Sequence, residues 1–115
     1  MKYSKFVTKR LTKRQCNLLV SKFYVSVKTN NIEDGAESLT IVKHFYQGDF
    51  GSTINYKVSA NRESFIIERY EYIVDESNNI IAEIEDMIVF NTFKSVIDFI
   101  EKDFNLIHRF SDFDI

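Results

Sequence analysis

Residues 65–104 read FIIERYEYIVDESNNIIAEIEDMIVFNTFKSVIDFIEKDF, and this stretch decides the fold. Its segments 65–74 and 80–90 are both rich in β-branched and aromatic side chains, which strands favour. The polar segment 75–79 lies between them. There Asn78 is suited to the left-handed conformation that a three-residue hairpin loop needs at its last position. The pattern predicts two long antiparallel strands and a tight turn that sets Val74 opposite Ile80.

That register divides the hairpin into two faces, because side chains alternate along a strand. The expected core face holds mostly apolar residues: Ile66, Tyr70, Tyr72, Val74, Ile80, Ala82, Ile84, Ile88 and Phe90. The second face pairs Arg69 with Glu85, which is favourable. It also pairs Glu71 with Glu83, which repel each other. Four apolar residues lie at the ends of this second face: Phe65, Ile67, Met87 and Val89. We expect the second face to be exposed to water.

A helix is predicted directly after the hairpin. Asn91 or Thr92 can cap its first free amides. Apolar residues then recur at spacings of three and four and form one stripe: Phe93, Val96, Ile97, Ile100 and Phe104. This stripe is expected to pack on one face of the hairpin. Residues 105–115 are expected to form a C-terminal extension, packed on the core or acting as an interaction tail.

The segment before the hairpin supplies the remaining elements. Thr12 followed by Gln15 is a capping-box pattern and predicts a helix over residues 13–24, although residues 22–28 also alternate like a strand. Residues 39–46 and 54–58 alternate as two further strands. We therefore predict an α+β fold: an antiparallel four-stranded meander flanked by an N-terminal and a C-terminal helix packed on one sheet face. Residues 1–115 form a single domain in this interpretation, with residues 1–11 as a basic arm.

The composition bears on origin and compartment. The chain has no proline and three glycines, whereas Ile, Asn, Lys and Phe are abundant, which indicates an AT-rich genome. A low-GC bacterium, or a phage or mobile element of one, has such a genome. The single Cys16 excludes an internal disulfide, and there is neither a secretory apolar segment nor a long apolar run. We expect a cytoplasmic location, in the host cell if the gene is phage-encoded, and no contact with a membrane.

Charge is divided unevenly along the chain. Residues 1–28 hold eight Lys and Arg and no acid, whereas residues 29–115 hold seven basic and 17 acidic residues. Such asymmetry can mark a nucleic-acid contact through residues 2–14. The candidate phosphate-binding side chains of this alternative are Lys5, Lys9, Arg10, Lys13 and Arg14. The same residues could instead pair with the acidic sheet.

The sequence offers little for catalysis. Cys16 lies on the apolar stripe of the first helix, and His44 and His108 have no clustered ligand partners, so no metal site and no cofactor are predicted. Glu68 and Asp86, opposite each other in the predicted register, are the one carboxylate pair that could share a proton. The sequence predicts a protein that is not an enzyme.

The remaining hypothesis is a small binding protein. An inhibitor or anti-defence protein of a phage or mobile element, of the anti-CRISPR-like class, would occlude a host protein or nucleoprotein surface. The expected partner-binding residues are those of the second hairpin face: Phe65, Ile67, Arg69, Glu71, Glu83, Glu85 and Met87. Acids would meet acids in a homodimer through this face, so a hetero-complex is favoured, although the oligomeric state stays open.

Overall fold

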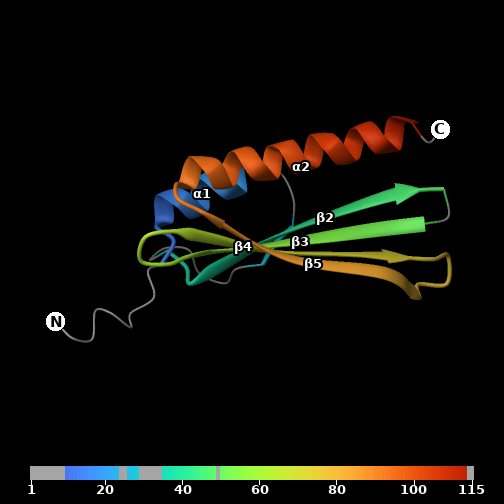
Figure 1. Ribbon diagram of the computed structural model, residues 1–115, viewed down its shortest axis with the longest axis horizontal. Coiled ribbons are helices and arrows are strands. Elements are labelled where there is room, and N and C mark those ends of the chain that lie inside the picture. Colours follow the sequence, from blue (N-terminus) through green and yellow to red (C-terminus); the bar gives the residue numbers. More distant parts are fainter. Residues whose placement is uncertain (1–9, 24–25, 29–34, 49, 114–115) are drawn as a thin grey trace.

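The computed structural model describes residues 10–23, 26–28, 35–48 and 50–113, without the side chains of 26–28, 47 and 106–113. Its elements follow one another as α1 (Lys13–Lys22), β1 (Ser26–Lys28), β2 (Ser38–Gln47), β3 (Phe50–Ala60), β4 (Phe65–Val74), β5 (Ile80–Phe90) and α2 (Phe93–Phe113). Figure 1 shows both helices on the same side of the sheet. The predicted α+β fold is confirmed.

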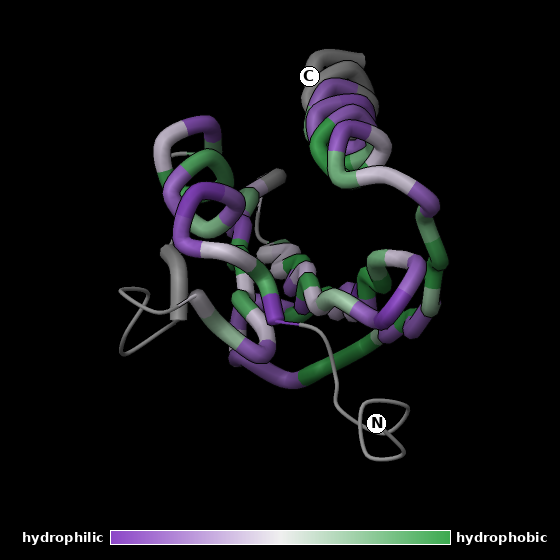
Figure 2. The backbone as a smooth tube through the Cα atoms, turned by 90° about the vertical axis from the view of Figure 1, so that its left-hand side faces the viewer, coloured by the Kyte–Doolittle hydropathy of each residue, from purple (hydrophilic) through white to green (hydrophobic). Residues whose placement is uncertain are grey.

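The sheet has the order β1-β2-β3-β4-β5, and every neighbouring pair is antiparallel. Strands β2 to β5 are the predicted meander. The short strand β1 adds to it beside Thr40–Val42, so the segment after α1 is a strand as its alternation allowed. Figure 2 looks along the molecule and shows the helices above a curved sheet.

Both helices begin at the predicted caps. The Thr12 side chain accepts from the Gln15 amide, and the Gln15 side chain accepts from the Thr12 amide. Thr92 Oγ1 accepts from the Ser95 amide at 3.1 Å at the start of α2. Helix α1 ends at Lys22 rather than residue 24. Helix α2 continues to Phe113, so the helix does not end near residue 104 as expected, and residues 105–113 of the predicted extension are helical.

The core lies between the helices and one face of the sheet, which we call the helix face. Val96, Ile97 and Ile100 of α2 are buried, as the apolar stripe predicts. They pack with Cys16 and Leu19 of α1 and with apolar residues of the strands: Leu39, Ile41, Ile54, Tyr56, Val58, Ala60, Phe65 and Ile67. The Phe104 ring of α2 contacts the Phe23 and Tyr56 rings, with centroids 5.4 and 5.6 Å apart. This ring joins both helices to the sheet.

The hairpin turn is as predicted, but the register beyond it is not. Asn78 has φ 64°, and Val74 lies opposite Ile80. A bulge then follows, because Ile73 pairs with Ala82 and leaves Ile81 as an extra residue. The pairing beyond the bulge is therefore shifted by one residue, and Arg69 lies opposite Asp86 rather than Glu85.

The predicted core residues of β4 lie on the face of the sheet that no described helix covers, where they are partly buried. The helix face of β4 carries Phe65, Ile67 and Arg69, whereas Ile66, Tyr70, Tyr72 and Val74 lie on the opposite, helix-free face. The predicted core residues of β5 do point toward the helix face, but α2 does not cover them, and most of β5 is exposed. Burial of Phe65 and Ile67 beneath α2 explains why this face of β4 points toward the helices. Each buried apolar side chain stabilises the fold by roughly 2 kcal/mol.

A polar network crosses the interface between α2 and the sheet. Asp103 Oδ2 accepts from the Tyr56 hydroxyl at 2.5 Å and from Arg69 Nε at 2.8 Å. Arg69 Nη1 also donates to Glu71 at 3.1 Å. Burial would lower the pKa of Arg69, but the hydrogen bond and charge of Asp103 and the hydrogen bond to Glu71 outweigh it, and the pKa is raised. Sequence reasoning missed this network, because Asp103 and Arg69 are 34 residues apart.

Candidate binding surface

Of the strands whose side chains the structure describes, β5 is the most exposed. It is the last strand in the sheet order, with β4 on one side and no other described strand on the other. Helix α2 reaches only its end, where the Phe90 and Phe99 rings lie 5.4 Å apart. Large apolar side chains are consequently left in water along β5, with Ile84 57 %, Met87 66 % and Val89 59 % exposed. An apolar strand at an open sheet edge is a candidate interaction site.

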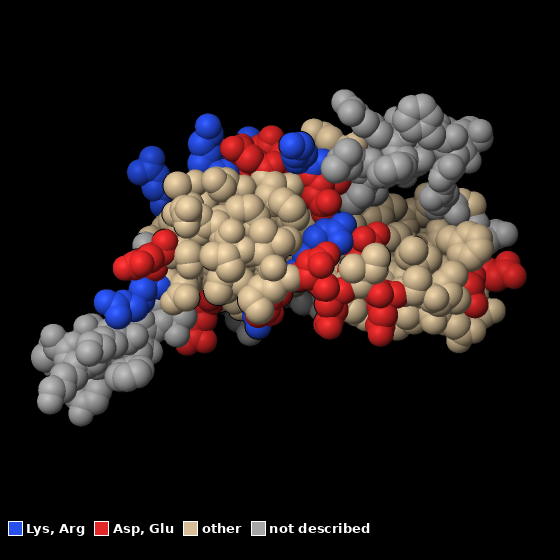
Figure 3. All heavy atoms as spheres, in the orientation of Figure 1, with Lys and Arg blue, Asp and Glu red and all other residues tan. Residues whose placement is uncertain are grey.

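Three acids lie in the middle of this strand: Glu83, Glu85 and Asp86. Within the described residues, Glu83 accepts a hydrogen bond from the Tyr70 hydroxyl at 2.6 Å, while Glu85 and Asp86 have no ion-pair partner. The bond to Glu83 raises the pKa of Tyr70 to about 12. Figure 3 shows carboxylates gathered at the middle of the molecule, with uncharged surface on either side.

The predicted partner-binding residues do not share one face. Phe65 and Ile67 are buried in the core, and Arg69 and Glu71 point to the helix face, where Arg69 is held by Asp103. The bulge explains this correction. The predicted register had no bulge and placed all seven residues on one face, whereas the shift by one residue puts those of β4 and those of β5 on opposite faces. The other three predicted residues, Glu83, Glu85 and Met87, lie together on the helix-free face and are exposed.

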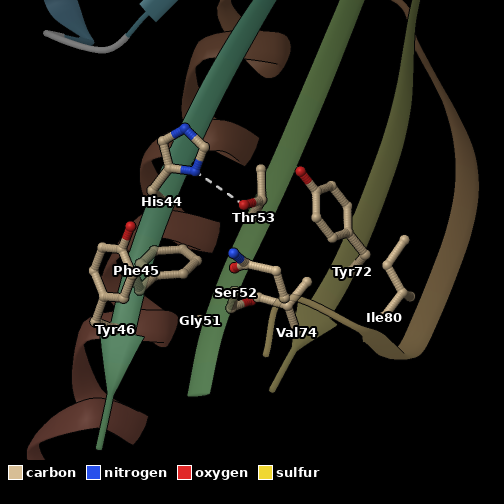
Figure 4. A pocket seen from close by; sticks show the side chains of 10 residues that line it. His44, Phe45, Tyr46, Gly51, Ser52, Thr53, Tyr72, Val74 and Ile80 are labelled. Atoms are coloured by element: carbon tan, nitrogen blue, oxygen red, sulfur yellow. Dashed lines mark hydrogen bonds between the residues drawn. The ribbon is translucent and has the colours of Figure 1, made fainter. Parts of the chain in front are cut away.

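Two open hollows on the helix-free face are lined by described residues. One, of about 420 Å³, lies at the end of the sheet near the β4–β5 turn. Figure 4 shows His44, Thr53, Tyr72 and Ile80 around it, with His44 Nδ1 2.9 Å from Thr53 Oγ1. The other, of about 640 Å³, lies in the middle of the sheet between Lys57 and Glu85 and opens toward β5. Strand β5 contributes Ile80 to the first hollow, and Glu85, Asp86 and Met87 to the second.

The catalytic and metal-binding candidates are not brought together. Glu68 lies opposite Met87 while Asp86 lies opposite Arg69, so the predicted carboxylate pair is wrong, as its members are on opposite faces. Cys16 is buried in the core as predicted, and burial raises the pKa of its thiol. No group of three metal-ligating side chains occurs among the residues that the structure describes. No described helix is long and apolar enough to cross a membrane.

The basic segment is described only in part. Lys5 and Lys9 lie outside the described residues. Arg10 donates to the Gly35 carbonyl at 3.5 Å and lies 3.7 Å from Glu37, while Lys13 and Arg14 begin α1. The Arg10 contacts match the alternative in which these cations pair with the protein's own acids.

Comparison with family models, curated proteins and solved structures finds no match for this chain.

Proposed function

We propose that the chain is a small non-catalytic binding protein that occludes a basic surface of a host protein or nucleoprotein through β5. In this proposal it is an inhibitor of the anti-CRISPR-like, anti-defence class, encoded by a phage or mobile element and acting in the cytoplasm of a low-GC host. The observation that carries the proposal is the β5 edge, where exposed apolar residues flank Glu85 and Asp86, which have no ion-pair partner among the described residues.

The two kinds of side chain on β5 have different roles in such a complex. Glu85 and Asp86 attract a basic partner and speed the encounter, since complementary charges raise association rates. Met87 and Val89 supply apolar area whose burial holds the complex together. Exposed apolar groups beside acids suit a partner surface that normally holds a polyanion such as nucleic acid.

Site-specific photo-crosslinking tests this proposal. A photoreactive residue at Met87 should capture one host protein at equal stoichiometry, whereas the same residue at Leu18, exposed on α1, should not. The captured protein should then lose its own activity when the purified chain is added in equimolar amount. Equal capture from both positions, or a captured protein whose activity is unaffected, would remove the proposal. Capture of RNA or DNA from residues near Arg14 would favour the nucleic-acid alternative instead.

A further inference from the structure

The backbone groups that β5 directs outward can be assigned from one turn. The Asn61 amide donates to the Ser64 carbonyl at 2.8 Å, so these residues are a hydrogen-bonded pair. Bonded and non-bonded pairs alternate in an antiparallel ladder, so Ser59 and Ile66 form the next bonded pair. Odd-numbered residues of β4 therefore direct their N–H and C=O groups toward β5.

The register carries this assignment across to β5. Ile67 pairs with Ile88 and Arg69 with Asp86, so even-numbered residues of β5 bond to β4. The odd-numbered residues direct their backbone groups to the open edge: Glu83, Glu85, Met87 and Val89. The side chains of these four residues also lie on the helix-free face. We call Ala82–Phe90, the regular part of β5 after the bulge, the acidic edge.

We infer that the acidic edge binds an extended basic segment of the partner by strand addition, in which the segment becomes a sixth strand of the sheet. This inference rests on the proposed function and names the partner's chemistry. Added strands gain affinity from backbone hydrogen bonds and specificity from alternate side chains. Glu83 and Glu85 are neighbours on one face, so they select Lys or Arg at alternate positions of the segment. Ile84 and Ile88 select apolar residues at the positions between.

A second copy of the chain fits this edge poorly. Two acidic edges paired about a two-fold axis would place the segments that hold Glu83, Glu85 and Asp86 side by side. Like charges directly opposite each other destabilise a strand pair. Acids on an open edge thus prevent self-association while leaving the edge free for a segment of opposite charge.

Hydrogen exchange with a defined probe tests the inference. The probe is a peptide of alternating Lys and Val as long as the acidic edge, and the control is a peptide of alternating Glu and Val. The amides of Glu85 and Met87 should exchange rapidly in the free protein and slow at least about tenfold with the Lys-Val peptide only. The amides of Asp86 and Ile88, already bonded to β4, should change little. The inference is overturned if the outward amides stay unprotected, or if they become protected at high protein concentration without peptide.

A proline substitution separates backbone from side-chain binding. Met87→Pro removes one outward N–H and leaves the β4 ladder intact, which edge strands tolerate. It should weaken binding of the Lys-Val peptide about tenfold more than Met87→Ala, which also loses the apolar side chain but keeps the N–H. Equal binding by both variants would overturn strand addition. Circular dichroism checks their folding, and the exchange experiment on the unaltered protein decides the matter if Met87→Pro unfolds.

The two proposals can fail separately. If the host protein captured at Met87 is inhibited equally by the Met87→Pro and Met87→Ala variants, strand addition is wrong and the binding function stands. If the Lys-Val peptide protects the outward amides but no host protein is inhibited, the edge site stands and the proposed function is wrong.

Discussion

Asp103 is the residue on which the attachment of α2 to the sheet depends most. Its carboxylate accepts from both Tyr56 and Arg69, and the Arg69 and Asp103 side chains are only 12 % and 17 % exposed. Asp103→Ala would leave the largely buried Arg69 guanidinium with Glu71 as its one carboxylate partner among the described residues. We expect the free energy of unfolding to fall by about 3 kcal/mol, the range for hydrogen bonds to charged groups. Urea unfolding measures it, and Asp98→Ala, on the exposed side of α2, should change it by less than about 0.5 kcal/mol.

Tyr56 makes the stability of this network depend on alkaline pH. Burial, followed by the hydrogen bond and charge of Asp103, raises the pKa of Tyr56 well above the ordinary value of 10.0. A raised pKa in the folded state stabilises the protein fully below the unfolded pKa and loses this contribution as pH rises beyond it.

The stability advantage of the native chain over Tyr56→Phe should therefore be constant near neutral pH. It should shrink as pH rises above 10.0. Urea unfolding of both proteins over this range measures the difference, and the other tyrosines cancel in the comparison. A pH-independent difference would contradict the buried hydrogen bond.

At the scale of elements, the β4–β5 hairpin and its cover by α2 make opposite predictions for two isoleucines. Ile67 is fully buried on β4, so Ile67→Asp would bury an unpaired charge and should unfold the domain. Ile84 is 57 % exposed on β5, so Ile84→Asp should cost less than about 1 kcal/mol. The predicted register placed Ile67 on the exposed face, and the predicted cover of β5 by the helix made Ile84→Asp the unfolding substitution. Thermal unfolding followed by circular dichroism measures both variants: Ile67→Asp tests the register, and Ile84→Asp tests how far α2 covers β5.

The same hairpin shows what the sequence can predict. Local features were predictable: the Asn78 turn, the Thr12 and Thr92 caps and the apolar stripe of α2 depend on residues close in sequence. The face of β4 was not, because residues 65–67 and 70–73 place apolar or aromatic side chains on both faces. Packing beneath α2 decides which face of β4 is buried. The extra residue Ile81 in the bulge then lets β5 keep its apolar face toward the helices. The exposure of the predicted surface was consequently right only in part. Glu83, Glu85 and Met87 are exposed as predicted, whereas Phe65 and Ile67 are buried.

At the scale of the molecule, the two ends of the sheet differ in how they are closed. The β2 edge is covered by β1 beside Thr40–Val42. The β5 edge has no described neighbour and carries three acids within four residues. Two cations line the hollow beside Glu85 and Asp86, and both make ion pairs with other acids: Arg69 bonds to Asp103, and Lys57 lies 3.8 Å from Glu68. Among the described residues, Glu85 and Asp86 thus have no ion-pair partner, and their negative charge should act on molecules that approach from solution.

This field makes a prediction about association rate. In a variant with Glu83, Glu85 and Asp86 all changed to Lys, a basic partner would be repelled during the encounter instead of attracted. Association with the host protein captured at Met87 should slow about tenfold or more at low salt, and the difference should shrink as salt screens the charges. The fold should persist, because all three side chains are exposed. A control with Glu63, Glu76 and Asp98 changed to Lys has the same net charge and alters exposed sites away from the middle of β5. Stopped-flow measurement of both variants gives the comparison. If the two triple variants slow association equally, net charge rather than the acidic edge steers binding; if neither does, the partner binds elsewhere.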